Sequence, residues 1–255
     1  MWTMYRVRWE FITQLCASVP GTSSLIEGWL KSRAPRARPA QSKSLDEIAA
    51  EVVSTLAEPE EIELPTTLVF QRVPLTDGTR ALAVRMATIK AHLKDCAYQI
   101  QTYTAGYAAG EKSLRAKLAN TVYWPATAPV MLYNGTPFVP VLRMDGTPFA
   151  EPTGVREKAI HIQTMQGPRS ALKAFEYCEN AVLEFPLAVL TAPDRKVKGG
   201  TGKEAKIAEK AGRPVIDEDD MKTVMLYGGM HGYAGERSED GGRYAFTITK
   251  EESRG

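Results

Sequence analysis

The residues best suited to chemistry gather near the end of the chain, between Gly228 and Tyr244. Six of these seventeen residues are glycines, which accept positive φ angles and let another backbone approach closely. Their amides could wrap a phosphate, while nearby side chains add positive charge and a ring on which a base can stack. The candidate residues are His231, Gly232, Tyr233, Gly235, Arg237 and Arg243. This pattern favours a phosphate-binding loop, and the alternative is an ordinary surface turn.

The chain has three histidines, and none suggests a metal site. His161 stands in an expected strand and His92 on an expected helix beside Lys90 and Lys94, where a surface position is the simpler interpretation. The Gly-x-Ser-x-Gly, P-loop and Gly-x-Gly-x-x-Gly motifs are absent from the sequence, which removes the usual signals for hydrolases, nucleotide triphosphatases and Rossmann enzymes. We therefore expect no catalytic residue, no metal and no cofactor.

Hydrophobic periodicity predicts a mixture of strands and helices. Tyr5, Val7, Trp9 and Phe11 alternate with charged residues, as in a half-buried strand. Helices are expected at 44–56, 88–103, 111–120 and 218–227, the last ending at Gly228-Gly229. Strands are expected at 67–73, 81–85, 130–133, 138–142, 158–165, 171–179, 181–190 and around 244–248. Pro186 suggests that strand 181–190 lies at a sheet edge.

Composition indicates an ordinary globular protein. Thirty-two Lys and Arg against thirty Asp and Glu leave a net charge of +2, which argues against a histone-like protein. Three cysteines without a Cys-x-x-Cys spacing suit a reducing cytoplasm, and neither a signal peptide nor a membrane partner is expected. We predict one domain over 1–255, with a basic linker at 34–43 and a flexible basic insertion at 194–213.

Three separated segments resemble one protein family. An N-terminal strand, the segment Ile89-Lys90-Ala91-His92-Leu93-Lys94 and a late glycine-rich loop leading into a strand are similar to features of the RAMP superfamily of CRISPR-associated RNA-binding proteins. The ending Gly241-Gly242-Arg243-Tyr244-Ala245-Phe246 also resembles phage and prophage proteins. Ala91 replaces a glycine of the family pattern, and charged residues interrupt the late loop. The resemblance implies an α+β, ferredoxin-like (RRM-like) antiparallel sheet with helices on one face.

The resemblance also implies a function and a set of contacts. It predicts a non-catalytic subunit that binds RNA or single-stranded nucleic acid together with other protein subunits or further copies of itself. The strand would lie on the free face of the sheet or beside the glycine loop. The side chains expected at phosphates are Arg85, Lys90, Lys94, Arg169, Lys173, Arg237 and Arg243.

Two other functions stay open at this point. A metal-independent endoribonuclease would use His92 or His231 as general acid or base, with Lys90 stabilising the phosphorane. A phage structural or assembly protein would use the change of sign between residues 1–43, with a net charge of +5, and residues 44–63, with −7, for subunit contacts.

Overall fold

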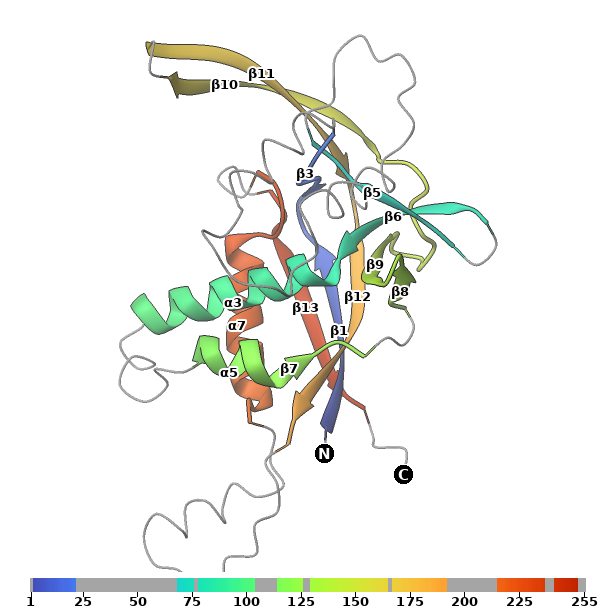
Figure 1. Cartoon of the computed structure of the whole chain (residues 1–255), viewed down its shortest axis with the longest axis vertical. Coiled ribbons are helices and arrows are strands. Elements are labelled where there is room, and N and C mark those ends of the chain that lie inside the picture. Colours follow the sequence, from blue (N-terminus) through green and yellow to red (C-terminus); the bar gives the residue numbers. More distant parts are fainter. Residues whose placement is uncertain are drawn as a thin grey trace, which may run out of the picture.

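The computed structural model describes residues 2–21, 68–75, 78–103, 114–125, 129–164, 167–191, 215–236 and 241–251, without the side chains of 160–172. The expected helix 44–56, the linker 34–43 and the insertion 194–213 lie outside these residues. The described part is an α+β structure with two sheets and three helices, α3 (Met86–Tyr103), α5 (Leu114–Thr121) and α7 (Glu218–His231) (Figure 1).

The larger sheet is antiparallel throughout. Its strand order is β13 (Tyr244–Lys250), β1 (Trp2–Phe11), β12 (Val182–Leu190), β9 (Thr136–Leu142), β6 (Arg80–Arg85) and β5 (Gln71–Pro74). Two short strands flank this path, β7 (Val122–Tyr123) beside β12 and β8 (Met131–Tyr133) beside β9. Asn134 and Gly135 both have positive φ at the β8–β9 turn, the geometry that a two-residue hairpin loop prefers.

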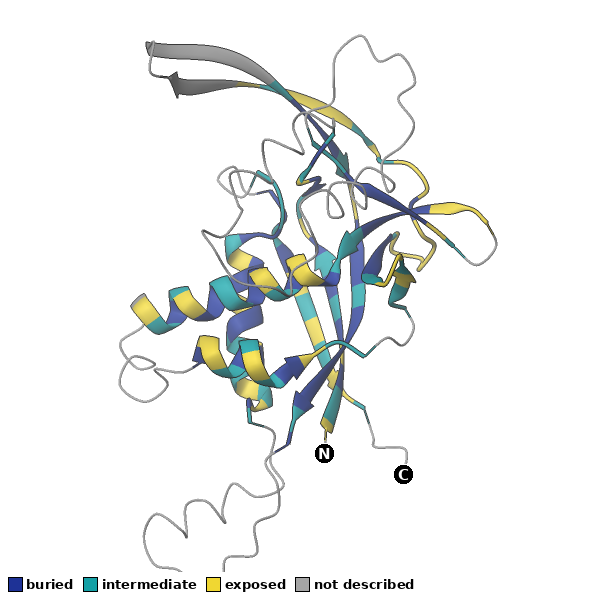
Figure 2. Ribbon diagram, in the orientation of Figure 1, coloured by how far each residue is buried: buried dark blue, intermediate teal, exposed yellow. Residues whose placement is uncertain are grey.

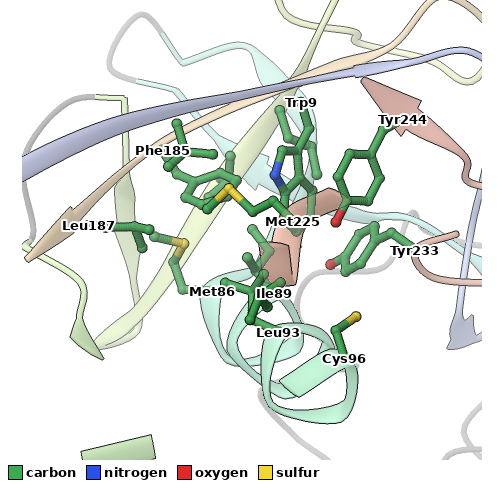
Figure 3. Close-up of a cluster of buried hydrophobic side chains, with 14 of the residues drawn as sticks. Trp9, Met86, Ile89, Leu93, Cys96, Phe185, Leu187, Met225, Tyr233 and Tyr244 are labelled. Atoms are coloured by element: carbon green, nitrogen blue, oxygen red, sulfur yellow. The ribbon is translucent and has the colours of Figure 1, made fainter. Parts of the chain in front are cut away.

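One face of this sheet forms the core. Tyr5, Val7, Trp9 and Phe11 are buried as their alternation predicted, and the helices cover them (Figures 1 and 2). The Trp9 ring stacks on Tyr244 with centroids 4.3 Å apart and meets Phe185 edge-on. Side chains of α3 and α7 complete this cluster, as Figure 3 shows. Burial of these large aromatic groups is the main force that holds helices and sheet together.

Two sequence expectations are wrong, one about this sheet and one about helix α7. Pro186 lies in β12, which is an inner strand and not an edge, since β1 pairs along one side of it. On the other side β9 and β7 reach only residues 182–183 and 188–189, so Pro186 lies where the second partner is missing. Helix α7 begins after the expected cap, Asp217, but continues through Gly228-Gly229 to His231, where Gly232, with a φ of +84°, caps it.

The smaller sheet supports a long hairpin, which we call the arm. The arm consists of β10 (Gly154–Thr164) and β11 (Gly167–Cys178), which pair antiparallel along their whole length and project from the body (Figure 1). The base of β11 pairs with β2 (Leu15–Cys16) and β4 (Leu68–Val69), and β4 pairs with β3 (Val19–Pro20). A buried ion pair, Arg72 with Glu176 at 2.9 Å, fixes this base to β5.

Candidate nucleic-acid interface

The pairing register of the arm gathers its positive charges on one side. Arg156 lies opposite Phe175, and Lys158 lies opposite Lys173. The same alternation puts position 169, opposite Ile162, on this side of the ladder. Glu157 and Glu176 belong to the alternate positions. Because residues two apart share a face of a strand, Arg156, Lys158 and Lys173 lie in one row, and the backbone register puts position 169 on the same face.

A carboxylate from the loop after α7 meets this basic side. Glu236 forms ion pairs with Lys158, at 3.0 Å, and with Lys173. Burial would raise the pKa of Glu236, but the hydrogen bonds and charges of Lys173 and Lys158 outweigh burial and lower it. Glu236 has a left-handed φ of +58°, an uncommon conformation for a residue with a side chain. The loop is therefore held against the arm, and one negative charge offsets part of the basic row.

The described residues of the glycine-rich loop, 228–236 and 241–244, do not present a row of open amides, which corrects the expectation of a phosphate cradle there. The amides of Gly232 and Tyr233 donate to the carbonyls of Gly228 and Gly242, each at 2.9 Å. Four further amides of this loop also have acceptors within the protein, namely those of Gly235, Gly241, Gly242 and Arg243. These bonds tie the loop to residues 13–16 and to its own backbone.

The glycines serve close packing instead. A Cβ at Gly228 would lie 2.8 Å from the His92 Nε2 atom and would overlap the Tyr244 hydroxyl. A Cβ at Gly235 would lie 2.6 Å from the Ala17 carbonyl oxygen. Glycine is thus required here because helix α7 and the loop approach neighbouring atoms too closely for a side chain.

Tyr233 and His92 are internal residues, contrary to their expected roles. Tyr233 is 3% exposed and its hydroxyl hydrogen-bonds to Thr88 at 2.6 Å, so its ring offers no open stacking face. Burial raises the pKa of Tyr233. His92 is 6% exposed, with Nε2 3.1 Å from the Tyr244 hydroxyl, so it is not a surface residue. Cys96 follows His92 by one helical turn and contacts its ring, a spacing that was visible in the sequence.

Lys90 and Lys94 do not form a trough with the glycine loop. Lys90 donates to the Val122 carbonyl at 2.8 Å and lies over the Tyr123 ring, and burial lowers its pKa, helped by the nearby charge of Lys94. Both lysines thus lie on the side of α3 that faces β7. Thr88 and His92, which are offset from them by about half a helical turn, lie toward the loop.

The remaining predicted residues divide into three groups. Arg85 lies beside the loop region, donating to the Gln71 side chain at 3.2 Å, and Lys173 contacts the loop through Glu236. His231 stacks on Tyr227 at the end of α7, and Arg243 contributes its backbone to the contact with Thr13. Arg237 and the Arg169 side chain lie outside the described residues. Sequence analysis missed Arg156, Lys158 and Glu236, although the alternation of Arg156 with Lys158 was a usable signal.

A pocket of 350 Å³ adjoins the arm. Val69 and Phe70 form its wall on the side of the smaller sheet, and Thr88, Ala91 and Asp95 line it from α3. The lining also includes Val84, Arg85, Gln71, Cys16, Tyr233 and Ala234. Cys16 also pairs with Tyr177 at the base of the arm, so the described lining reaches the arm through β2, while the loop and α3 contribute lining residues directly.

The sheet face opposite the helices is different in character. Arg6 forms ion pairs with Glu184 and Glu251, each at 3.0 Å, and Arg8 pairs with Glu10 at 2.7 Å. Two arginines therefore meet three glutamates in this network, which leaves it without a positive surplus. Such a face does not favour a polyanion, and this weakens the expectation that nucleic acid lies on the free face of the sheet.

Neither a metal-binding cluster nor a membrane-spanning helix is found among the described residues. No group of three or more His, Cys, Asp or Glu residues in that part of the chain is arranged to hold a metal ion. Within the same residues, no helix combines the length and the apolar character needed to cross a membrane.

Comparisons with known proteins add one structural likeness. No protein-family model and no curated protein matches the chain. Among solved structures, a chain of a complex described as "Cryo-EM structure of the Type III-B Cmr-beta bound to cognate target RNA" aligns with 10% identity and a TM-score of 0.35. The alignment covers 98% of this chain and 61% of the other, so this protein spans about three fifths of its length. A TM-score of this size does not establish a shared fold.

Proposed function

We propose that this protein binds RNA or another single-stranded nucleic acid along the basic side of the arm, without catalysing a reaction. The observation that carries the proposal is the register that puts Arg156, Lys158 and Lys173 in one row, with position 169 further along it. A strand of phosphates carries its charges one after another, so a row of cations along one face of a projecting hairpin suits it. Glu236 offsets one positive charge, so the basic side of the arm keeps a surplus of positive charge.

We also propose that the core is ferredoxin-like and RAMP-like. In chain order β1, α3, β9, β12, α7 and β13 form a β-α-β-β-α-β series, and the four strands lie side by side in the order β13-β1-β12-β9. Both the series and the antiparallel pairing agree with that fold. In the same view the protein works as one subunit of a nucleoprotein assembly, with the arm reaching beyond its own body.

Salt-dependent binding tests the proposal. Fluorescence anisotropy with a labelled 20-nucleotide RNA should give an affinity that falls as salt rises, with a slope of about 0.7 per phosphate contact. Replacing Arg156 and Arg169 by Gln should weaken binding roughly tenfold and reduce the slope by about 1.4. The matched control replaces Arg115 on α5 and Lys250 on β13 by Gln, which removes the same charge far from the arm (Figure 1). Equal losses in both variants would overturn the assignment to the arm.

A further inference from the structure

The pocket beside the arm has the size and lining of a ligand site. Its volume of 350 Å³ falls at the lower end of the range of roughly 300–1,000 Å³ that small-molecule sites occupy. Phe70, Val69 and Val84 provide apolar surface, while Arg85, Gln71 and Asp95 provide polar groups. A mainly apolar cavity with a few polar groups fits a flat ring that carries donors and acceptors at its edge.

The pocket also lies next to the basic row. Ala234 lines the pocket, and two residues later Glu236 pairs with Lys158 and Lys173 of the arm. Cys16 lines it as well and is directly opposite Tyr177 of β11. A strand whose phosphates follow the arm to its base would therefore come close to two residues of the pocket lining, Cys16 and Ala234.

We propose that the pocket takes one unstacked base of a single strand whose phosphates lie along the arm. This inference rests on the proposed function, which concerns the phosphates, and adds a contact with one nucleobase. Proteins that bind single-stranded RNA commonly hold splayed bases between aromatic and apolar side chains and hydrogen-bond their edges. The lining contains both a guanidinium, that of Arg85, and a carboxylate, that of Asp95, so donor and acceptor chemistry are both present beside the edge of a base.

An obstruction experiment tests the pocket separately from the arm. Ala91 is an exposed residue of α3 that lines the pocket, and Ala87 is an exposed residue one turn earlier that does not. Ala91→Phe should fill the pocket, and Ala87→Phe is the matched control. The probes are a labelled 20-nucleotide RNA and an abasic sugar–phosphate oligomer of the same length, compared by anisotropy at one salt concentration.

The expected result is specific to the probe that carries bases. Wild type should bind the RNA about tenfold more tightly than the abasic oligomer, which is within the range that one stacked base supplies. Ala91→Phe should lose this preference while binding the abasic oligomer as wild type does, which also shows that the variant is folded, and Ala87→Phe should keep it. Equal binding of both probes by wild type, or a preference unchanged in Ala91→Phe, would overturn the pocket assignment and leave the arm intact. Failure of both probes to bind wild type would instead overturn the proposed function.

Discussion

The Lys158 ammonium donates a 3.0 Å hydrogen bond to the carboxylate of Glu236, and this bond joins the arm to the loop that follows α7. A carboxylate in this position occupies cations that would otherwise meet a phosphate. The same contact orders the loop beside the pocket. In the proposed mode of binding, Glu236 would compete with the phosphates while it holds the loop that contributes Ala234 to the pocket.

Removing this carboxylate should strengthen binding. Glu236→Gln keeps the shape of the side chain but adds one net positive charge to the basic row, so RNA affinity should rise about three- to tenfold at low salt. Glu157→Gln makes the same change of charge at an exposed position on the other side of the arm and is the control. Anisotropy titrations of the three proteins measure the effect. Weaker binding by Glu236→Gln than by Glu157→Gln would contradict competition.

The pH dependence of stability follows from the lowered pKa of Glu236. A carboxylate whose folded pKa is below the ordinary value of 4.5 stabilises the fold above that value, and this contribution disappears as pH falls through the folded pKa. As pH falls below 4.5, the free energy of unfolding should therefore decrease more steeply for wild type than for Glu236→Gln. Urea unfolding followed by circular dichroism from pH 6 to pH 3 measures both slopes. Parallel curves would show that the two ion pairs do not persist in solution.

A side chain at Gly228 should destabilise the protein. The added methyl group of Gly228→Ala would overlap the Tyr244 hydroxyl and approach the His92 ring, and overpacking of this kind costs about 1–3 kcal/mol. The gain in helix propensity, about 1 kcal/mol, offsets part of that cost. Leu226→Ala, at an exposed position of the same helix, is the control and should change stability by about 0.5 kcal/mol or less. Thermal or urea unfolding measures the difference, and a stabilised Gly228→Ala protein would refute the packing role.

The individual strands and helices of this fold are largely predictable from the sequence, whereas the way they pair and pack is not. The alternation in Tyr5–Phe11 and the helical spacing of 88–103 predicted β1 and α3, because both patterns are local. The position of Pro186 was misjudged, since only tertiary pairing shows that β12 lacks a second neighbour there. The expectation that the glycines within 228–242 bind phosphate is wrong for a similar reason. Their bonds to residues 13–16 join distant parts of the chain, which no local pattern reveals.

Loss of the buried carboxylate at the base of the arm should destabilise the protein strongly. Glu176 pairs with Arg72 and accepts the Phe70 amide at 2.7 Å. Glu176→Ala leaves the buried Arg72 without this partner and should cost about 3–5 kcal/mol. Glu179→Ala, at an exposed position just beyond β11, is the control, with an expected change within about 0.5 kcal/mol. Urea unfolding distinguishes the two, and similar small losses would show that the ion pair does not hold the base of the arm.

Photo-crosslinking with RNA that carries 4-thiouridine, followed by mass spectrometry of the crosslinked peptides, tests the central claim most directly. The larger sheet offers an internal alternative, because Trp2 and Tyr123 form an exposed aromatic pair near its end, with ring centroids 5.0 Å apart. If the strand follows the arm, crosslinks should fall on peptides that cover 154–178 and on the part of α3 that lines the pocket. Crosslinks confined to Trp2 and Tyr123 would contradict the account.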